Sequence, residues 1–210
     1  MKESRLFSFI DKQSAFTVHY LEGNKLIQDI NKVHNIGQKA QEFYREALLS
    51  SMQMVNFMKA TENMGFYIDS EEPYFRFKIE MNEQGSMRTL LLPEDFEDFP
   101  NDISGRARIT KAFPNKQPYA SVIELVKEKT NAVVNKMLKE SYQSNTEILV
   151  GKSNFSLMFS KLPPSNLAEK FDEIIDVPLA DFISQHSGLF SELEELDLTE
   201  EKEIISFLEK

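Results

Sequence analysis

A small set of residues in this sequence has the types and spacing that chemistry requires. Gly151-Lys152-Ser153 matches the end of a phosphate-binding loop, whose backbone amides and lysine hold phosphate groups. The complete pattern needs an earlier glycine at the position that Thr146 occupies here. A strand rather than a helix is predicted to follow, so no helix N-terminus faces a phosphate. We therefore interpret these residues as a turn.

The imidazole side chains are His19, His34 and His186. None lies in the closely spaced pattern of a zinc enzyme, and a metal site or a catalytic triad would need the fold to bring distant residues together. Ordinary surface or half-buried histidines are therefore favoured. The chain has no cysteine, which excludes disulfides, thiol catalysis and cysteine-bound zinc within it.

Acidic clusters at 94–98 and 192–197 lack the pattern of a calcium loop and are interpreted as solvated segments. The methionines of a predicted helix at 40–58 could form an adaptable binding surface, but a core stripe is the favoured interpretation. No catalytic residue, cofactor site or metal site is predicted. No enzyme motif remains, and composition alone leaves the function open.

The N-terminal residues lack the apolar core of a secretory signal. No apolar run approaches the roughly 18 residues that a membrane-spanning helix needs. We therefore expect a cytoplasmic protein without a membrane partner.

The net charge of −10 is concentrated at one end of the chain. Residues 165–210 contain 13 acids and 3 bases, which leaves 21 acids and 21 bases in residues 1–164. A neutral body with an acidic tail disfavours nucleic acid and anionic membranes as partners. The change in composition at Pro163-Pro164 predicts two parts, a core domain at 1–164 and an acidic helical tail at 165–210.

Alternating apolar and polar residues predict short strands linked mostly by hairpins, and steps of three and four predict helices between them. The segment 105–163 is interpreted as a hairpin, a helix and a hairpin that form one sheet with a helix across it. The fold class is therefore α+β with a largely antiparallel sheet. The predicted strands are 5–10, 16–21, 65–69, 74–81, 87–92, 105–111, 117–125, 146–150 and 155–162, and the predicted helices are 26–34, 40–58 and 126–141.

The acidic tail is also rich in large apolar residues. Its pattern fits amphipathic helices at 166–176, 178–186 and 199–209, each near or below the length at which an isolated helix persists in water. They are predicted to dock on an apolar face of 1–164, in the same chain or in a second copy that exchanges tails. The side chains predicted to make this tail contact, or to bind a client, are Phe171, Ile174, Ile175, Phe182 and Ile183.

Four segments together resemble the heat shock protein 33 family of redox-regulated holdase chaperones. Residues 47–59 resemble the family's long buried helix, and Ile109-Thr-Lys111 with Pro118-Tyr119 and 122–125 resembles its VTKD…PYxGxVxL segment. Residues 141–146 and 157–163 resemble two further motifs in the same order and spacing.

The sequence departs from the family at several positions. Phe155-Ser156 replaces a glycine pair, Asn145 replaces a proline, and Ser121 or Ala120 replaces a glycine. The family's C-terminal domain binds zinc through four cysteines and senses oxidants, and it has no counterpart in this sequence. Residues 165–210 resemble only the linker before it, so either the sequence is cut there or the protein has lost its switch.

The resemblance implies a large twisted, mostly antiparallel sheet with packed helices, followed by a helical linker. It implies ATP-independent binding of unfolding client proteins, without the redox switch in this chain. The alternative is a divergent interaction or scaffold module with one dedicated protein partner.

Because the chain contains no thiol, peroxide cannot alter its activity by forming a disulfide. We expect the suppression of light scattering from a thermally unfolding client to be the same before and after peroxide. Methionine oxidation is the remaining sulfur chemistry, and burial of methionine slows it. A gain of activity that dithiothreitol reverses would contradict this prediction.

Overall fold

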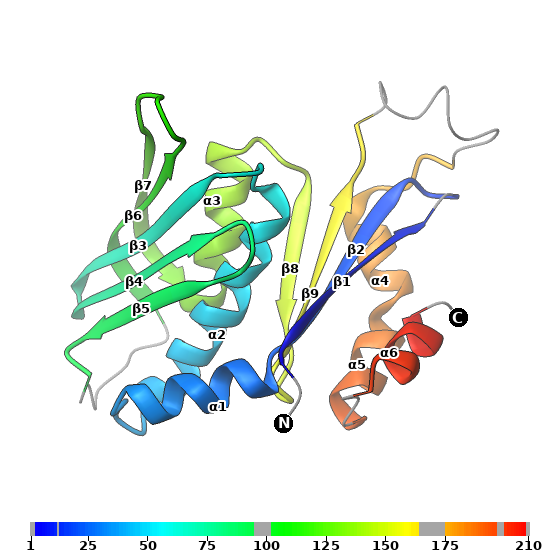
Figure 1. Cartoon of the computed structure of the whole chain (residues 1–210). Coiled ribbons are helices and arrows are strands. Elements are labelled where there is room, and N and C mark those ends of the chain that lie inside the picture. Colours follow the sequence, from blue (N-terminus) through cyan, green and yellow to red (C-terminus); the bar gives the residue numbers. More distant parts are fainter. Residues whose placement is uncertain (1–2, 12, 95–101, 164–174, 197–199, 209–210) are drawn as a thin grey trace. The chain divides into compact units, whose positions relative to one another are not determined.

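The computed structural model describes residues 3–11, 13–94, 102–163, 175–196 and 200–208. The chain forms two compact units, one of Met1–Leu26 with Ser144–Lys210 and the other of Ile27–Gln143 (Figure 1). The division of the sequence near residue 164 into a core domain and a tail stays a prediction.

The unit Ile27–Gln143 contains a five-stranded antiparallel sheet with helices packed on one face (Figure 1). The sheet order is β5-β4-β3-β6-β7. Its strands are β3 (Asn63–Glu72), β4 (Tyr74–Asn82), β5 (Met87–Leu92), β6 (Asp102–Ala112) and β7 (Tyr119–Lys129). The helical elements are α1 (Asn24–Val33), which begins just before the unit, α2 (Ala40–Met52), η1 (Gln53–Phe57), η2 (Thr130–Ala132) and α3 (Val133–Ser141).

Alternation along β4 determines which face of this sheet is covered. Phe75, Phe77, Ile79 and Met81 are buried, whereas the residues between them are exposed or half-buried. The ring of Phe43 in α2 lies 5.0 Å from that of Phe75, in an edge-to-face contact. The predicted half-buried strand is therefore confirmed, and its apolar face packs on α2.

The long helix predicted at 40–58 is confirmed with a different ending. Regular α-helix stops at Met52, and η1 continues it as a tighter turn of 3₁₀ type. Leu48 is fully buried and Val55 is half-buried. The helix predicted at 126–141 begins later, at Thr130, because β7 continues to Lys129 beyond an irregularity in its pairing with β6.

The other unit contains a four-stranded antiparallel sheet that joins the two ends of the chain. Its order is β1-β2-β9-β8, and β2 pairs with β9 across about 140 residues of sequence, with Phe16 opposite Lys161. The strands are β1 (Arg5–Asp11), β2 (Phe16–Glu22), β8 (Thr146–Val150) and β9 (Phe155–Lys161).

The α+β class with antiparallel pairing is confirmed, and the strands form two sheets. The hairpin at β6–β7 belongs to the five-stranded sheet, whereas the hairpin at β8–β9 belongs to the four-stranded one. The expected single sheet across 105–163 is thereby corrected. Separately, the helices that the structure describes include none with the length and apolarity needed to cross a membrane.

Replacing Leu48 tests the orientation of α2. Its side chain is 0% exposed, so Leu48→Ala should lower the free energy of unfolding by about 2–5 kcal/mol through lost burial and a cavity. The matched control is Val33→Ala in α1, where the side chain is 78% exposed and the expected change is below about 0.5 kcal/mol. Urea denaturation measures both, and an equal effect of the two substitutions would contradict the assigned orientation.

Candidate functional site

Three short helices follow the four-stranded sheet in the sequence and pack on one of its faces (Figure 1). They are α4 (Leu179–Gln185), α5 (Ser187–Glu195) and α6 (Glu201–Leu208). The predicted helices at 178–186 and 199–209 are confirmed, and α5 had not been predicted. Most of the helix predicted at 166–176 lies outside the described residues.

The face beneath these helices consists of aromatic and aliphatic side chains from the two central strands. Alternate residues of β2 and β9 point to the same side, since strand side chains alternate. All of them are at most 3% exposed. They are Phe16, Tyr20, Phe155, Leu157 and Phe159.

Each of the three helices places a buried side chain on this face. Phe182 of α4 is 2% exposed, Leu193 of α5 is 1% exposed, and α6 contributes Ile204 and Phe207. The rings of Phe182 and Phe16 stack with their centroids 4.1 Å apart. Together with the sheet residues these side chains form one apolar cluster, which we call the tail-covered face.

The five predicted contact residues have different positions. Phe182 is central to the tail-covered face, and Ile183 is half-buried at its margin. Ile175 is 62% exposed. Phe171 and Ile174 lie outside the described residues. The role of these five side chains in binding a client stays a prediction.

Polar contacts attach the tail at its margins. Lys161 forms an ion pair with Asp176 and donates a hydrogen bond to the carbonyl of Val177 at 2.9 Å. At the opposite end of β9, the Ser153 hydroxyl donates to the carbonyl of Glu194 at 2.9 Å. The residues Gly151-Lys152-Ser153 form the β8–β9 turn, as predicted. The Lys152 amide donates to the Glu194 carboxylate at 3.4 Å, so an acidic side chain takes the amide that a phosphate would need.

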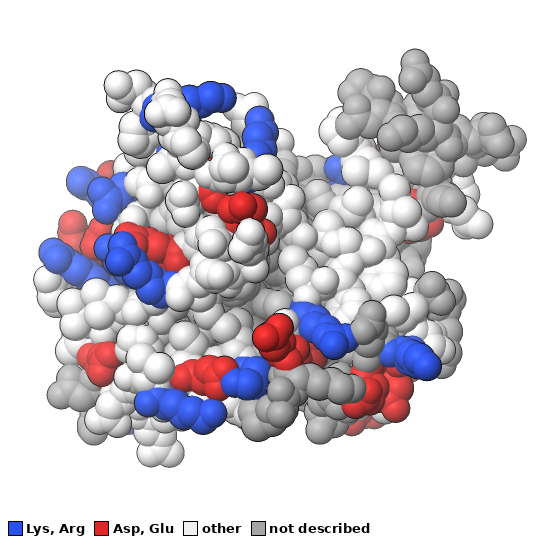
Figure 2. All heavy atoms as spheres, in the orientation of Figure 1, with Lys and Arg blue, Asp and Glu red and all other residues white. Residues whose placement is uncertain are grey.

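The outer face of the five-stranded sheet carries charges of both signs, which Figure 2 shows intermixed over the region of β3 to β5. Arg76 pairs with Asp69 and Arg106 with Glu124, each at 3.5 Å. This pairing makes the face a mosaic of both signs rather than a continuous basic surface.

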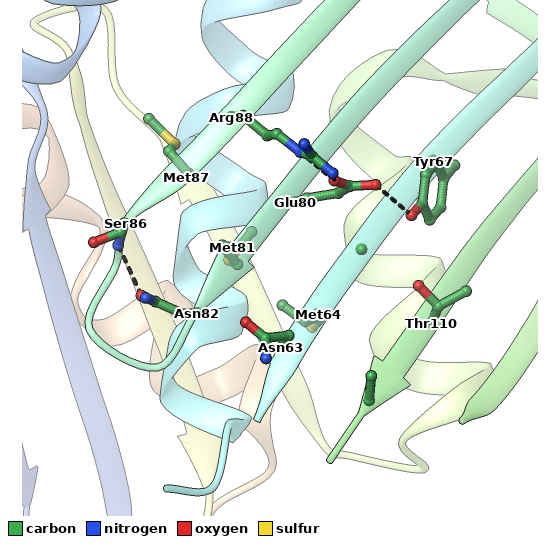
Figure 3. A pocket seen from close by; sticks show the side chains of 12 residues that line it. Asn63, Met64, Tyr67, Glu80, Met81, Asn82, Ser86, Met87, Arg88 and Thr110 are labelled. Atoms are coloured by element: carbon green, nitrogen blue, oxygen red, sulfur yellow. Dashed lines mark hydrogen bonds and ion pairs between the residues drawn. The ribbon is translucent and has the colours of Figure 1, made fainter. Parts of the chain in front are cut away.

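A shallow pocket of about 540 Å³ lies on this face (Figure 3). The Tyr67 hydroxyl donates to Glu80 at 3.0 Å, Lys78 lies 2.9 Å from the same carboxylate, and Arg88 also pairs with it. The guanidinium of Arg108 lies 4.5 Å from the centre of the Tyr67 ring. The hydrogen bond from Lys78, with those from Arg88 and Tyr67, lowers the pKa of Glu80. Glu80 is therefore ionised and saturated with donors, which makes it a poor general acid or base at neutral pH.

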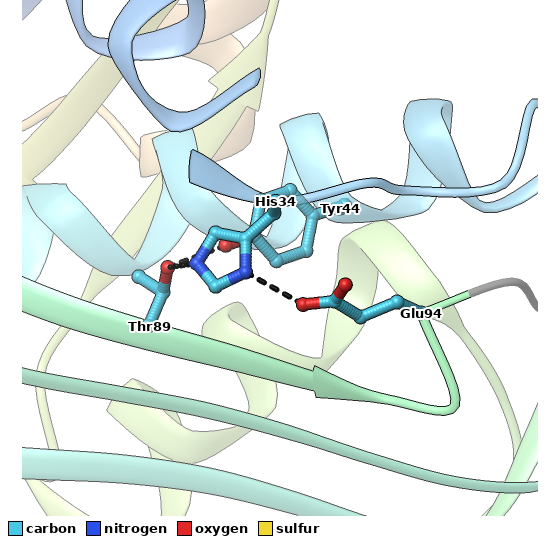
Figure 4. Close-up of polar contacts among 4 residues, drawn as sticks. All are labelled: His34, Tyr44, Thr89 and Glu94. Atoms are coloured by element: carbon cyan, nitrogen blue, oxygen red, sulfur yellow. Dashed lines mark hydrogen bonds and ion pairs between the residues drawn. The ribbon is translucent and has the colours of Figure 1, made fainter. Parts of the chain in front are cut away.

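A second polar network links α2 and the segment after α1 to the edge strand β5 (Figure 4). His34 Nδ1 lies 2.8 Å from Glu94 Oε1, and its Nε2 lies 3.2 Å from Thr89 Oγ1, which also bonds to the Tyr44 hydroxyl. An ionised carboxylate only accepts, so Nδ1 donates to it. This bond lowers the pKa of Glu94, and burial raises the pKa of Tyr44. These hydrogen bonds link α2 and the segment after α1 to β5.

The other histidines also have local partners. His19 Nδ1 lies 2.8 Å from the Ser8 hydroxyl, and burial lowers the pKa of His19 to about 4, so it is neutral at pH 7. His186 Nδ1 lies 2.8 Å from the carbonyl of Phe182. Within the described part of the chain, no three acidic or histidine side chains gather as a metal site would require.

A buried ion pair was not predicted. Glu62 is 1% exposed, and Lys111 Nζ lies 3.4 Å from its Oε1 and 4.1 Å from the centre of the Tyr142 ring. Burial, followed by the charge of Glu62, raises the pKa of Tyr142. The amide of Lys59 donates to the other carboxylate oxygen at 2.7 Å. These contacts join three distant segments, and no periodicity in the sequence indicates them.

Comparisons with known proteins agree with the fold. A family model described as Hsp33 protein matches residues 4–206. The structure is similar to that of the 33 kDa chaperonin (heat shock protein 33 homolog) of Thermotoga maritima, with a TM-score of 0.67 and 13% sequence identity. The likeness covers 87% of this chain and 66% of that one, so this chain spans just under two thirds of its length. A search of the curated proteins found no match.

Acid titration tests the network around His34. The folded-state pKa of Glu94 lies below its ordinary value of 4.5, so its stabilisation is present above that pH and is lost as the pH falls through the lower value. We expect Glu94→Gln to lower the free energy of unfolding by about 1 kcal/mol at pH 7, and the difference from the parent to shrink as the pH falls below 4.5. Urea denaturation at several pH values measures this.

The matched control is Glu140→Gln, at an exposed position of α3. Its difference from the parent at pH 7 should be small, since the side chain is exposed. A Glu94→Gln effect that stays constant down to pH 3, or that matches the control, would contradict the proposed charge-assisted bond.

Proposed function

Because the chain belongs to the Hsp33 protein family, we propose that it is a holdase-type chaperone that binds unfolding proteins without ATP. The observation that carries the proposal is the tail-covered face. A continuous aromatic and aliphatic surface lies beneath three short helices, which are attached at the margins by a few polar contacts. Exposed patches of this kind bind apolar segments of other proteins.

The energetics of docking favour reversible cover. Burying a large apolar side chain such as Phe182 contributes roughly 1.5–3 kcal/mol. Ordering the backbone opposes this by about 1–2 kcal/mol per residue, and three helices of seven to nine residues persist poorly alone. The docked tail is therefore only marginally favoured, and marginal elements open first. Opening would present the sheet face and the apolar tail side chains to a client.

We propose that this chain acts without the redox switch of its family and without a cofactor. Zinc ligation by four cysteines does not fit the residues present, because the chain has none. No step in client binding is assigned to an acid, a base or a metal. The proposed control is the equilibrium between docked and open tail.

The proposed partners are unfolding proteins in the cytoplasm, with no contribution from nucleic acid or membrane. A second copy of the chain is the other acceptor for the tail, since the same contacts can form between chains. The side chains proposed for both uses are Phe182 and Ile183, together with Phe171 and Ile174. Ile175, which is 62% exposed, is proposed for client contact alone.

Two substitutions within the tail test whether its docking covers an apolar binding face. Phe182→Ala removes a ring that is 2% exposed and stacked on Phe16, so we expect greater binding of anilinonaphthalene sulfonate and faster hydrogen exchange in α4 to α6. Ile175→Ala is the control, because that side chain is 62% exposed, and it should change neither signal. Deletion of 165–210 should give the largest increase in dye binding. If the tail of the intact chain exchanges as slowly as α2, or deletion leaves dye binding unchanged, the reversible-cover mechanism is wrong.

Client holding is tested by light scattering of a thermally unfolding protein, at substoichiometric and equimolar doses and without oxidant. We expect suppression by the intact chain and stronger suppression by Phe182→Ala than by Ile175→Ala. If the intact chain and both variants fail to suppress scattering, and a pull-down returns one stoichiometric partner, the chain is an interaction module instead.

A further inference from the structure

The strand β7 forms one margin of the five-stranded sheet (Figure 1). Among the described strands it pairs with β6 alone. Its first half, residues 119–123, is Tyr-Ala-Ser-Val-Ile and contains no charge. Tyr119 is 50% exposed and Val122 is 54% exposed. An uncharged, exposed edge of this kind is a template for pairing with another extended chain.

Each of the other edge strands carries at least one charged residue, as the second half of β7 also does. Arg88 lies in β5, Glu147 in β8, and Arg5 with Asp11 in β1. Charged residues on an edge strand oppose pairing with another chain. At β5, the Thr89 side chain is also engaged by His34 and Tyr44. Residues 119–123 are thus one of the three longest uncharged edge segments among the described strands, beside 6–10 of β1 and 89–92 of β5, and a hydrogen bond on β7 identifies its outward backbone groups.

One hydrogen bond shows which backbone groups face outward from β7. Lys136 Nζ donates to the carbonyl of Glu124 at 2.9 Å, so this carbonyl points away from β6. The N–H and C=O of one strand residue share a side, and alternate residues share a direction. The backbone groups of Ala120 and Val122 therefore also point outward. Val122 presents both a donor and an acceptor beside an exposed apolar side chain.

The second half of β7 is protected. Lys136 occupies the carbonyl of Glu124, and the pairing with β6 becomes irregular after Leu125. Lys127 has a φ of +50°, and its amide bonds to the Ser104 hydroxyl instead of continuing the ladder. Irregularities of this kind twist an edge away from a regular partner. The open segment is therefore limited to 119–123.

We propose that residues 119–123 bind an extended, uncharged segment of an unfolded protein as an added β-strand. The proposal rests on the proposed chaperone function for the nature of the partner, and it adds a second site distinct from the tail-covered face. Backbone hydrogen bonds do not depend on the side chains of the partner, so this mode of binding suits a protein that holds many different clients. A second copy is the less suitable occupant, because five residues a side fall well below the roughly 20–30 of a stable interface.

A synthetic peptide tests the site directly. The probe is a fluorescent peptide of about ten residues that alternates Val and Thr between terminal Lys residues, and its anisotropy reports binding to the intact chain. Val122→Pro removes the outward N–H, and proline is tolerated at such an edge position. We expect this substitution to weaken binding at least about fivefold, the factor that corresponds to one net hydrogen bond. Val122→Thr keeps the N–H and should bind as the parent does.

A peptide methylated on alternate backbone nitrogens is the matched control for the ligand, and it should bind weakly to every variant. If Val122→Pro fails to fold by circular dichroism, residue-resolved hydrogen exchange on the intact chain replaces it. The unmethylated peptide should then slow exchange of the Val122 amide. The proposal is overturned if the intact chain does not bind the peptide, or if Val122→Pro binds it as tightly as the parent does. It is also overturned if the methylated peptide binds as tightly as the unmethylated one, or if the peptide leaves exchange of the Val122 amide unchanged. Dimerisation that Val122→Pro abolishes, seen by sedimentation, would assign the edge to a second copy and overturn it as well.

The scattering assay separates this site from the chaperone function. If the intact chain holds clients and Val122→Pro neither binds the peptide less tightly nor holds clients less well, the function stands and the edge site fails. If peptide binding depends on the Val122 amide while the intact chain holds no client, the edge site stands and the chaperone function fails.

Discussion

The stacking of Phe182 on Phe16 is the contact on which the unit of Met1–Leu26 and Ser144–Lys210 depends. The four-stranded sheet has a face of aromatic and aliphatic side chains that cannot remain in water without a large unfavourable free energy. The tail helices cannot persist without an apolar surface. The sheet gives the helices an apolar surface, and the helices cover the side chains that the sheet would otherwise expose. Phe182 lies at the centre of this contact.

The sheet and the helices of this unit are held by different interactions. The sheet is held by backbone pairing of four strands, including a β2–β9 ladder that joins distant parts of the sequence. The helices are held mainly by side-chain burial, with Lys161 and Ser153 as polar attachments at the margins. Opening of the helices would break none of the hydrogen bonds between the strands. This difference in how the two parts are held is what the proposed reversible cover requires.

Local patterns in the sequence predicted most elements, because strand alternation and helical spacing depend on neighbouring residues. The strands at Phe75 to Met81 and the helix at Leu48 are examples. The partition into two sheets could not be predicted, since the pairing of Phe16 with Lys161 depends on tertiary structure. The shortness of the tail helices predicted that they need an apolar face. The sequence did not predict which residues of the sheet form that face. The bonds of His34 to Glu94 and of Lys111 to Glu62 also join distant segments, so neither pair leaves a periodic signal.

The charge of the tail adds a further term to its docking. Residues 165–210 carry a net charge of −10, and the described acids Asp181, Glu192 and Glu203 are exposed. Docking on a sheet gathers these like charges, whereas an open tail can separate them. The repulsion acts over roughly 8–10 Å at physiological ionic strength and weakens as salt is added. Salt also strengthens apolar burial when the anion is excluded from the protein surface. Both effects of added salt favour the covered state. If the tail opens as proposed, we therefore expect the aromatic face to be most exposed at low ionic strength, where the acids of the tail oppose the stacking of Phe182 most strongly.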